Sequence, residues 1–284
     1  MSVAPASNQR ASVTGSQDVR VAIAGLGTIG RKVAERLDQG ISGLRLVAVS
    51  ARDRKKAVAG IAQFKNQITV EPLDRLPQLA DVIVECLPAA LFREIAEGAL
   101  DAGRTLIAVS CGALLANPDL VERARKGGGR IIVPTGALLG LDAVQAAAEG
   151  TIHSVRMVTR KPPWGLAGAP FIVEHGITLE GLSEPLKIFE GTAHDAVRGF
   201  PANVNVAAAL SLAGIGADRT VVEIWADPTL DRNVHTIEVD SDSAQFSMTI
   251  NNIPTDENPK TGRITALSVI AVLRKQTEAV RIGT

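Results

Sequence analysis

Cysteine is scarce in this sequence, with two residues among 284. Cys86 and Cys111 lie in apolar stretches without CxxC spacing, which favours buried thiols in a reducing compartment over a disulfide framework. A catalytic Cys111 is the weaker alternative. No cluster of cysteine, histidine and acidic residues has the spacing of metal ligands, so we expect no bound metal. These absences predict a cytoplasmic protein.

The sequence has no excess of positive or negative charge and no long apolar run. Lys plus Arg and Asp plus Glu both number 30, so no net field draws the chain to nucleic acid or to a membrane surface. The sequence also lacks a stretch of about 18 uncharged apolar residues, the length that a membrane-spanning helix needs. We therefore expect a small-molecule partner, no nucleic acid and no membrane.

Apolar residues make up 46% of the chain, enough for a sizeable core, and the length of 284 residues predicts two domains. Residues 1–18, rich in Ser, Ala and Gln, are expected to form a disordered tail. Residues 19–136 are expected to form a dinucleotide-binding domain, with a C-terminal helix in residues 256–284 packing back on it. Residues 137–255 then form a domain for substrate binding and dimerisation.

Short apolar runs alternate with amphipathic stretches up to residue 136, which predicts an α/β fold with a doubly wound parallel sheet of the Rossmann type. Strands are expected at 19–24, 44–50, 80–86, 105–110 and 130–134, and helices at 29–37, 90–102 and 118–126. Later strand-like runs are shorter and predict a second, α+β domain with an open, mostly antiparallel sheet. Its strands are expected at 151–160, 170–174, 221–226, 235–240 and 244–251, with a helix at 202–212. The last helix, at 261–275, is the one expected to pack back on the first domain.

A glycine-rich loop follows the first predicted strand and opens the first predicted helix. It reads Gly25-Leu26-Gly27-Thr28-Ile29-Gly30, the GxGxxG spacing of dinucleotide-binding loops. Gly25 permits the tight turn, Gly27 lets the backbone approach a pyrophosphate, and Gly30 lets helix and strand pack closely. Free N–H groups of the helix start, at Thr28 and Ile29, then face the anion. The alternative is a glycine-rich turn in an unrelated α/β domain.

The end of the second predicted strand is expected to contact the adenosine ribose. Here the chain reads Ser50-Ala51-Arg52-Asp53-Arg54, an acidic residue flanked by two arginines. An acid at this place favours NAD, whereas a nearby arginine accepts the 2′-phosphate of NADP. We interpret Arg52 as a cofactor-binding residue and expect NADP, or dual use of NAD and NADP. A solvated loop is the alternative.

Three further segments carry a family resemblance. They are 134–142 (PTGALLGLD), 200–207 (FPANVNVA) and 226–235 (ADPTLDRNVH), the last followed by 258–261 (NPKT). Together with the phosphate loop they resemble the L-aspartate dehydrogenase family, whose patterns are SGAIGGLDA, FPxNxNVA, DPxxxxNxH and NPKTS. The likeness runs over nearly the whole chain. Thr135, Leu139 and Gly262 depart from these patterns.

The resemblance implies NAD(P)-dependent oxidation of L-aspartate to iminosuccinate, which hydrolyses to oxaloacetate and ammonia, and the reverse reductive amination. It implies that His235 of the NxH pattern is catalytic. It also implies that Asn205 and Ala137 contact the cofactor. A role in NAD biosynthesis is one that the family implies, and nitrogen assimilation or aspartate breakdown is another.

The chemistry of such a reaction fits these residue types. Deprotonating an amine and activating water both suit a base with a pKa near neutrality, and histidine meets that need. His235 follows a predicted turn in a polar segment, and a structural loop histidine is the alternative. Asn203 and Asn205 precede an alanine-rich helix, so one of them caps it and the other binds substrate or cofactor.

A dicarboxylate substrate needs cations. Lys161 and Lys260 are the candidates for its carboxylates, with plain surface solvation as the alternative. Rival functions are another two-domain NAD(P) oxidoreductase, similar to dihydrodipicolinate reductase or homoserine dehydrogenase, and a non-catalytic NADP-binding sensor. We also expect a homodimer that forms through the second domain.

Overall fold

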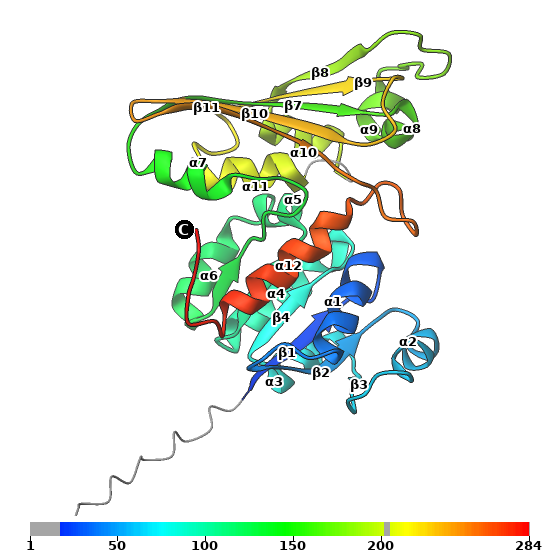
Figure 1. Cartoon of the computed structure of the whole chain (residues 1–284), viewed down its shortest axis with the longest axis vertical. Helices are drawn as coiled ribbons and strands as arrows, with labels where there is room; N and C mark the ends of the chain where they lie inside the picture. The colour runs from blue at the N-terminus through cyan, green and yellow to red at the C-terminus, as the bar shows by residue number, and fades with distance from the viewer. Residues whose placement is uncertain (1–17, 202–204, 284) are drawn as a thin grey trace, which may run out of the picture.

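The computed structural model describes residues 18–201 and 205–283, and it places them in two stacked parts (Figure 1). The lower part in that view holds a parallel sheet, and the upper part holds a second sheet with helices beneath it. Residues 1–17, on which the predicted tail falls, lie outside the described residues.

The first sheet, called sheet A, has six parallel strands in the order β3-β2-β1-β4-β5-β6. Its strands are β1 (Val19–Ala24), β2 (Leu44–Ser50), β3 (Thr69–Val70), β4 (Val82–Glu85), β5 (Thr105–Ala108) and β6 (Arg130–Ile132). The central strands are apolar along their length because helices cover both faces of the sheet. This order and direction confirm the predicted Rossmann-type fold.

One face of sheet A packs against α1 (Thr28–Asp38) and α12 (Arg263–Lys275), which lie side by side (Figure 1). Val269 and Leu273 of α12 are fully buried in this layer, so the end of the chain completes the core of its beginning. The other face is covered by α3 (Leu76–Leu79), α4 (Ala89–Asp101) and α6 (Asp119–Gly127). Shorter elements of this part are α2 (Arg54–Ile61), η1 (Leu73–Arg75) and α5 (Cys111–Leu115).

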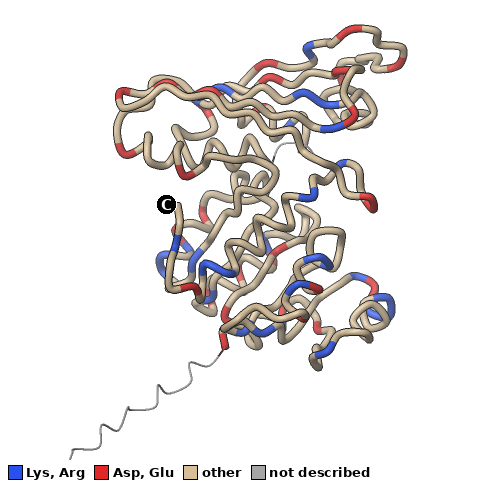
Figure 2. Tube along the Cα trace, viewed as in Figure 1, with Lys and Arg blue, Asp and Glu red and all other residues tan. Residues whose placement is uncertain are grey.

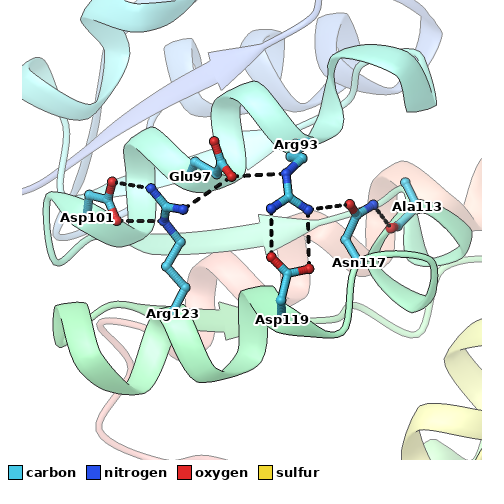
Figure 3. Close-up of polar contacts among 7 residues, drawn as sticks. All are labelled: Arg93, Glu97, Asp101, Ala113, Asn117, Asp119 and Arg123. Atoms are coloured by element: carbon cyan, nitrogen blue, oxygen red, sulfur yellow. Dashed lines mark hydrogen bonds and ion pairs between the residues drawn. The ribbon is translucent and has the colours of Figure 1, made fainter.

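A ladder of ion pairs joins α4 to α6 (Figure 3). Arg93 of α4 reaches Asp119 at 2.7 Å, and Arg123 of α6 reaches Asp101 at 2.6 Å. Glu97 lies between the two guanidinium groups, 3.0 and 3.2 Å from them. Two-pronged arginine–carboxylate contacts fix the relative orientation of the two helices, which together cover one face of sheet A.

The second sheet, called sheet B, has the order β11-β10-β7-β9-β8 and is antiparallel except where β7 pairs with β9. Its strands are β7 (Ile152–Lys161), β8 (Leu186–Thr192), β9 (Thr220–Ala226), β10 (Val234–Ser241) and β11 (Gln245–Asn251). Its inner face packs on α7 (Leu141–Ala148), α10 (Ala193–Gly199) and α11 (Asn205–Ala213). Its outer face is left uncovered by the described residues (Figure 1). The predicted open, mostly antiparallel sheet is therefore confirmed.

One predicted strand is wrong. Residues 170–174 form the helix α9 (Pro170–Glu174), which follows α8 (Pro163–Leu166). Proline at the first helical position loses no hydrogen bond there. Ile172 is buried in the core of the second part, and the partly buried Phe171 packs against that core. The sequence patterns also failed to predict β8 and α7.

The charges of both signs are interspersed over both parts of the molecule (Figure 2). Among the described residues, no helix has the length and apolar character needed to cross a membrane. In the same part of the chain, no group of three or more His, Cys, Asp and Glu side chains could hold a metal ion.

Candidate active site

The phosphate loop joins β1 to α1, and steric contacts explain its glycines. Gly25 has a φ of +99°, and a Cβ there would lie 2.4 Å from the Cys86 carbonyl oxygen. A Cβ on Gly30 would lie 1.9 Å from the carbonyl oxygen of Gly25. A Cβ on Gly27, in contrast, would meet no atom within 4 Å. Two glycines therefore permit close packing, and the third leaves the mouth of the loop open.

The start of α1 offers an anion site at this loop. Gly27 is the N-cap residue and has no side chain to cap the helix, and the first turn holds no acidic residue. The first N–H groups of the helix, around Thr28 and Ile29, keep their capacity to donate to a phosphate. The loop thus fits a pyrophosphate, and the roles of Gly25, Gly27, Thr28, Ile29 and Gly30 toward the cofactor remain predictions.

A cleft of about 1060 Å³ lies above the carboxyl ends of β1, β2 and β4. Its lining includes Gly25, Gly27 and Arg52, so the structure brings these predicted cofactor residues together. The lining also includes Leu87 and Pro88, which follow β4. Clefts at this edge of a doubly wound sheet are the usual site of dinucleotides.

Asp53, the acid beside Arg52, is engaged in the backbone. Its side chain accepts a hydrogen bond from the Lys56 N–H at 2.9 Å and so caps α2. A carboxylate that caps a helix is less available to a ribose hydroxyl. Arg52, Arg54 and Lys56 meanwhile line the cleft with positive charge.

Two asparagines make long-range hydrogen bonds near the junction of the two parts. The Asn205 Oδ1, at the start of α11, accepts a hydrogen bond from the Gly112 N–H of α5 at 3.0 Å. The Asn252 Nδ2 donates to the Ala137 carbonyl oxygen at 2.9 Å. Asn205 and Ala137, both predicted cofactor residues, therefore lie where the two parts meet.

His235 lies on the inner face of sheet B, opposite Thr159 in the register of β10 and β7. The Thr159 Oγ1 and the His235 Nδ1 are 3.2 Å apart, and both side chains are buried. Lys161 is two residues beyond Thr159 on the same face, and it is also buried. We call Thr159, Lys161 and His235 the His235 cluster.

Burial moves the proton affinities in this cluster. Burial, followed by the charge of Lys161, lowers the pKa of His235 to about 3. Burial, followed by the charge of Lys260, lowers the pKa of Lys161 to about 8. The residue type predicted a histidine pKa near neutrality. This prediction is wrong for the free protein, because the imidazole is almost fully buried.

Of the predicted substrate residues, Lys161 is buried and Lys260 is exposed, and they are close enough for the charge of one to act on the other. Asn203 lies outside the described residues. Gly262, where the family pattern has serine, packs against Asn252, and a Cβ on it would lie 3.0 Å from the Asn252 Oδ1.

Sequence reasoning missed three polar side chains. Thr159 and Asn252 stand in ordinary strand and loop positions, so no local signal marks them. Among the described residues, no donor forms a hydrogen bond with the buried Oδ1 of Asn252. The Asn252 N–H donates to the Asn233 carbonyl oxygen at 2.9 Å. Glu85 did have a signal, because it is a charged residue at the end of an apolar strand.

Comparison with known proteins agrees with this geometry. The model of the family described as aspartate dehydrogenase, C-terminal, matches residues 142–276, and that of the homoserine dehydrogenase NAD-binding domain matches residues 25–134. An L-aspartate dehydrogenase of Bradyrhizobium diazoefficiens is 61% identical over 95% of this chain and 96% of the relative. The chain belongs to the L-aspartate dehydrogenase family. A second relative in the family, L-aspartate dehydrogenase 3 of Bordetella bronchiseptica, is 55% identical over 94% of this chain and 98% of its own.

Membership in the L-aspartate dehydrogenase family confirms the resemblance drawn from the motifs, and the NAD-binding match confirms NAD or NADP as the cofactor. The similarity to homoserine dehydrogenase is found in the nucleotide-binding half, residues 25–134. A crystal structure of aspartate dehydrogenase from Thermotoga maritima matches with a TM-score of 0.72 at 22% identity. It covers 94% of this chain and 100% of that chain, which shows a shared fold.

Proposed function

We propose that this protein is an L-aspartate dehydrogenase, which oxidises L-aspartate to iminosuccinate with NAD or NADP and also runs the reverse reductive amination. The iminosuccinate hydrolyses to oxaloacetate and ammonia. One observation carries the proposal beyond family membership: the buried His235 cluster lies at the end of sheet B that Asn252 ties to Ala137. The strand that carries His235 is thus bonded through Asn252 to Ala137, the first residue of the second domain.

The phosphate loop and the start of α1 hold the pyrophosphate in this proposal, and Arg52 holds the adenosine end. Asn205 and Ala137 lie on the side of the second part of the molecule. The nicotinamide cofactor supplies the hydride acceptor or donor when it is bound. The protein residues orient the substrate, exclude water and move protons.

His235 is the proposed catalytic base. Its lowered pKa keeps the imidazole neutral in the free protein, where it binds a proton only weakly. A bound dicarboxylate brings negative charge beside it, which favours the imidazolium and raises the pKa from its free-state value. The hydroxyl of Thr159 at Nδ1 fixes the orientation of the ring.

Lys161 and Lys260 are the proposed partners of the substrate carboxylates, together with Asn203. Burial is the larger cause of the lowered pKa of Lys161, and the charge of Lys260 adds to it because the two lysines repel each other. A dianion between them would relieve that repulsion. This arrangement selects a substrate with two carboxylates over an amino acid with one.

A homodimer through the uncovered face of sheet B is the proposed assembly. That face carries exposed Val221 and half-buried Trp225, and Arg156 on it bonds Glu223 and Glu238 at 2.7 Å each. Apolar groups with both signs of charge make a self-complementary patch, which a two-fold interface requires. We also propose a cytoplasmic location, a role in supplying NAD biosynthesis, and the domain boundaries 19–136 with 256–284, and 137–255.

Absorbance at 340 nm tests the activity directly. The purified protein is assayed with L-aspartate and each oxidised cofactor, and with oxaloacetate, ammonia and each reduced cofactor. His235→Ala is expected to lower kcat/KM by about 100-fold or more, the scale of general acid–base catalysis. The control is His194→Ala, since His194 is exposed and lies 3.4 Å from Asp218. Full activity of His235→Ala contradicts the catalytic role, and cofactor binding without turnover favours a sensor.

A further inference from the structure

Glu85, the last residue of β4, is a fully buried carboxylate that the proposed chemistry leaves unused. Its Oε1 accepts hydrogen bonds from the Leu87 N–H at 2.7 Å and from the Ser110 hydroxyl at 2.9 Å. Its Oε2 accepts one from the Ser110 N–H at 2.9 Å. The carboxylate therefore binds the segments that follow two neighbouring strands, β4 and β5.

Each oxygen of Glu85 accepts a hydrogen bond from a backbone N–H, Oε1 from Leu87 and Oε2 from Ser110. The Ser110 hydroxyl lies within hydrogen-bond distance of both Oε1 and the Leu87 carbonyl oxygen, at 2.9 and 3.2 Å. Burial raises the pKa of Glu85, and the hydrogen bonds from Ser110 and Leu87 act against that rise. Burying a carboxylate costs free energy, and the three hydrogen bonds to Glu85 offset part of that cost.

The two segments that Glu85 holds form part of the cofactor site. In the segment after β4, the Cys86 carbonyl oxygen packs against Gly25 of the phosphate loop, and Leu87 lines the cleft. In the segment after β5, Ser110 leads into α5, whose Gly112 N–H is bonded to Asn205. The Glu85 carboxylate thus fixes the segment that packs against the phosphate loop. It also fixes the segment whose Gly112 N–H binds Asn205 at the start of α11.

We propose that Glu85 is a positioning residue for the dinucleotide, which aligns the floor of the cleft and the Gly112–Asn205 contact before the cofactor binds. Pre-alignment lowers the ordering cost of binding, so its loss appears in cofactor affinity. The proposal rests on the cofactor half of the proposed function and is independent of which amino acid is the substrate.

Glu85→Gln tests this with little change in shape. Either orientation of the amide puts its NH₂ group against an N–H donor, that of Ser110 or that of Leu87. Isothermal titration with NADH and with NADPH is expected to show a Kd at least about tenfold higher than in the unchanged protein. In steady-state assays the increase falls on the KM of the cofactor more than on the KM of aspartate.

Asp81→Asn is the matched control, because Asp81 directly precedes the same strand at its opposite end. Its carboxylate accepts three hydrogen bonds from Arg20, so the change also replaces a bonded carboxylate by an amide. Thermal unfolding is expected to show a lower Tm for this control, while its cofactor Kd stays within about twofold. A Kd that rises equally in both variants would show a general loss of packing and overturn the proposal.

Ser110→Ala covers the case in which Glu85→Gln fails to fold. It removes the hydroxyl donor and keeps the N–H, so a smaller rise in Kd, of about threefold, is expected. An unchanged cofactor Kd in whichever of the two variants is folded overturns the positioning role. If the unchanged protein binds neither nucleotide, the proposed function fails together with this inference, and that outcome is distinct from the others.

Discussion

Burial on the inner face of sheet B changes what two side chains can do. His235 is 2% exposed and Lys161 is 5% exposed, and the pKa of each is lowered chiefly because the charged form loses water. The residue types alone suggest an imidazole that titrates near neutrality and a lysine that stays charged. In their places in the fold, the imidazole is neutral throughout the physiological range and the lysine titrates just above it.

The pH dependence of substrate binding follows from Lys161. Its pKa of about 8 means that the cation is present below that pH and is lost above it. We expect the KM for oxaloacetate to rise as the pH increases through about 8. Lys260→Ala removes a positive charge that lowers the pKa of Lys161, so the increase in KM should occur at a higher pH than in the unchanged protein. The KM of this variant should also be larger at every pH, because one cation for the substrate is lost. The measurement is the KM for oxaloacetate between pH 6.5 and 10.

Lys187→Ala is the control for this profile, since Lys187 pairs with Glu190 on β8 away from the His235 cluster. Its profile should match that of the unchanged protein. A rise that stays at the same pH in Lys260→Ala would refute the assigned coupling between the two lysines.

The three glycines of the phosphate loop before α1 have different roles. Gly25 and Gly30 contact backbone atoms so closely that no side chain fits, whereas Gly27 faces open space. The contact between Gly30 and Gly25 is local, so the spacing in the sequence is enough to predict it. The contact between Gly25 and Cys86 forms only when β4 pairs with β1.

Two alanine substitutions separate these roles. Gly30→Ala places a Cβ against the Gly25 carbonyl oxygen and should prevent stable packing of α1 on β1, with a large drop in Tm. Gly27→Ala should fold with a Tm close to that of the unchanged protein and lose cofactor affinity by about tenfold or more, since its methyl group enters the cleft. Circular dichroism and cofactor titration measure both effects. Normal cofactor affinity in Gly27→Ala would contradict the role of this loop.

At the scale of the whole molecule, the uncovered face of sheet B is the surface that the proposed homodimer uses. Trp225 lies on this face beneath the Arg160 guanidinium, 4.7 Å from the ring centroid. Trp225→Glu is expected to convert the dimer into a monomer in sedimentation velocity, because it replaces the apolar ring of the interface by a carboxylate that must lose its water there. Trp164→Glu is the control, since Trp164 is exposed on α8, off the strands of sheet B. A protein that is already monomeric at assay concentration would exclude the dimer.

The extent of sequence-based prediction differs between the two parts. Five of the six strands of sheet A were predicted, because buried parallel strands are continuous apolar runs bounded by turns. In the second part, residues 170–174 were misassigned and β8 was missed. Short runs that are apolar on one side are compatible with either a helix or an edge strand, and only packing against Phe200 and its neighbours decides between them.

The sequence by itself determined the nucleotide-binding loop, the fold class and the family, because these depend on residue spacing within short segments. Only the tertiary structure decided the surroundings of His235. The Thr159 hydroxyl reaches it across 76 positions, and Asn252 reaches Ala137 across 115. Strand register and the packing of distant segments create such contacts. The same packing removes the water whose loss shifts the pKa values. These are properties of the folded chain because water leaves the site only when distant segments come together.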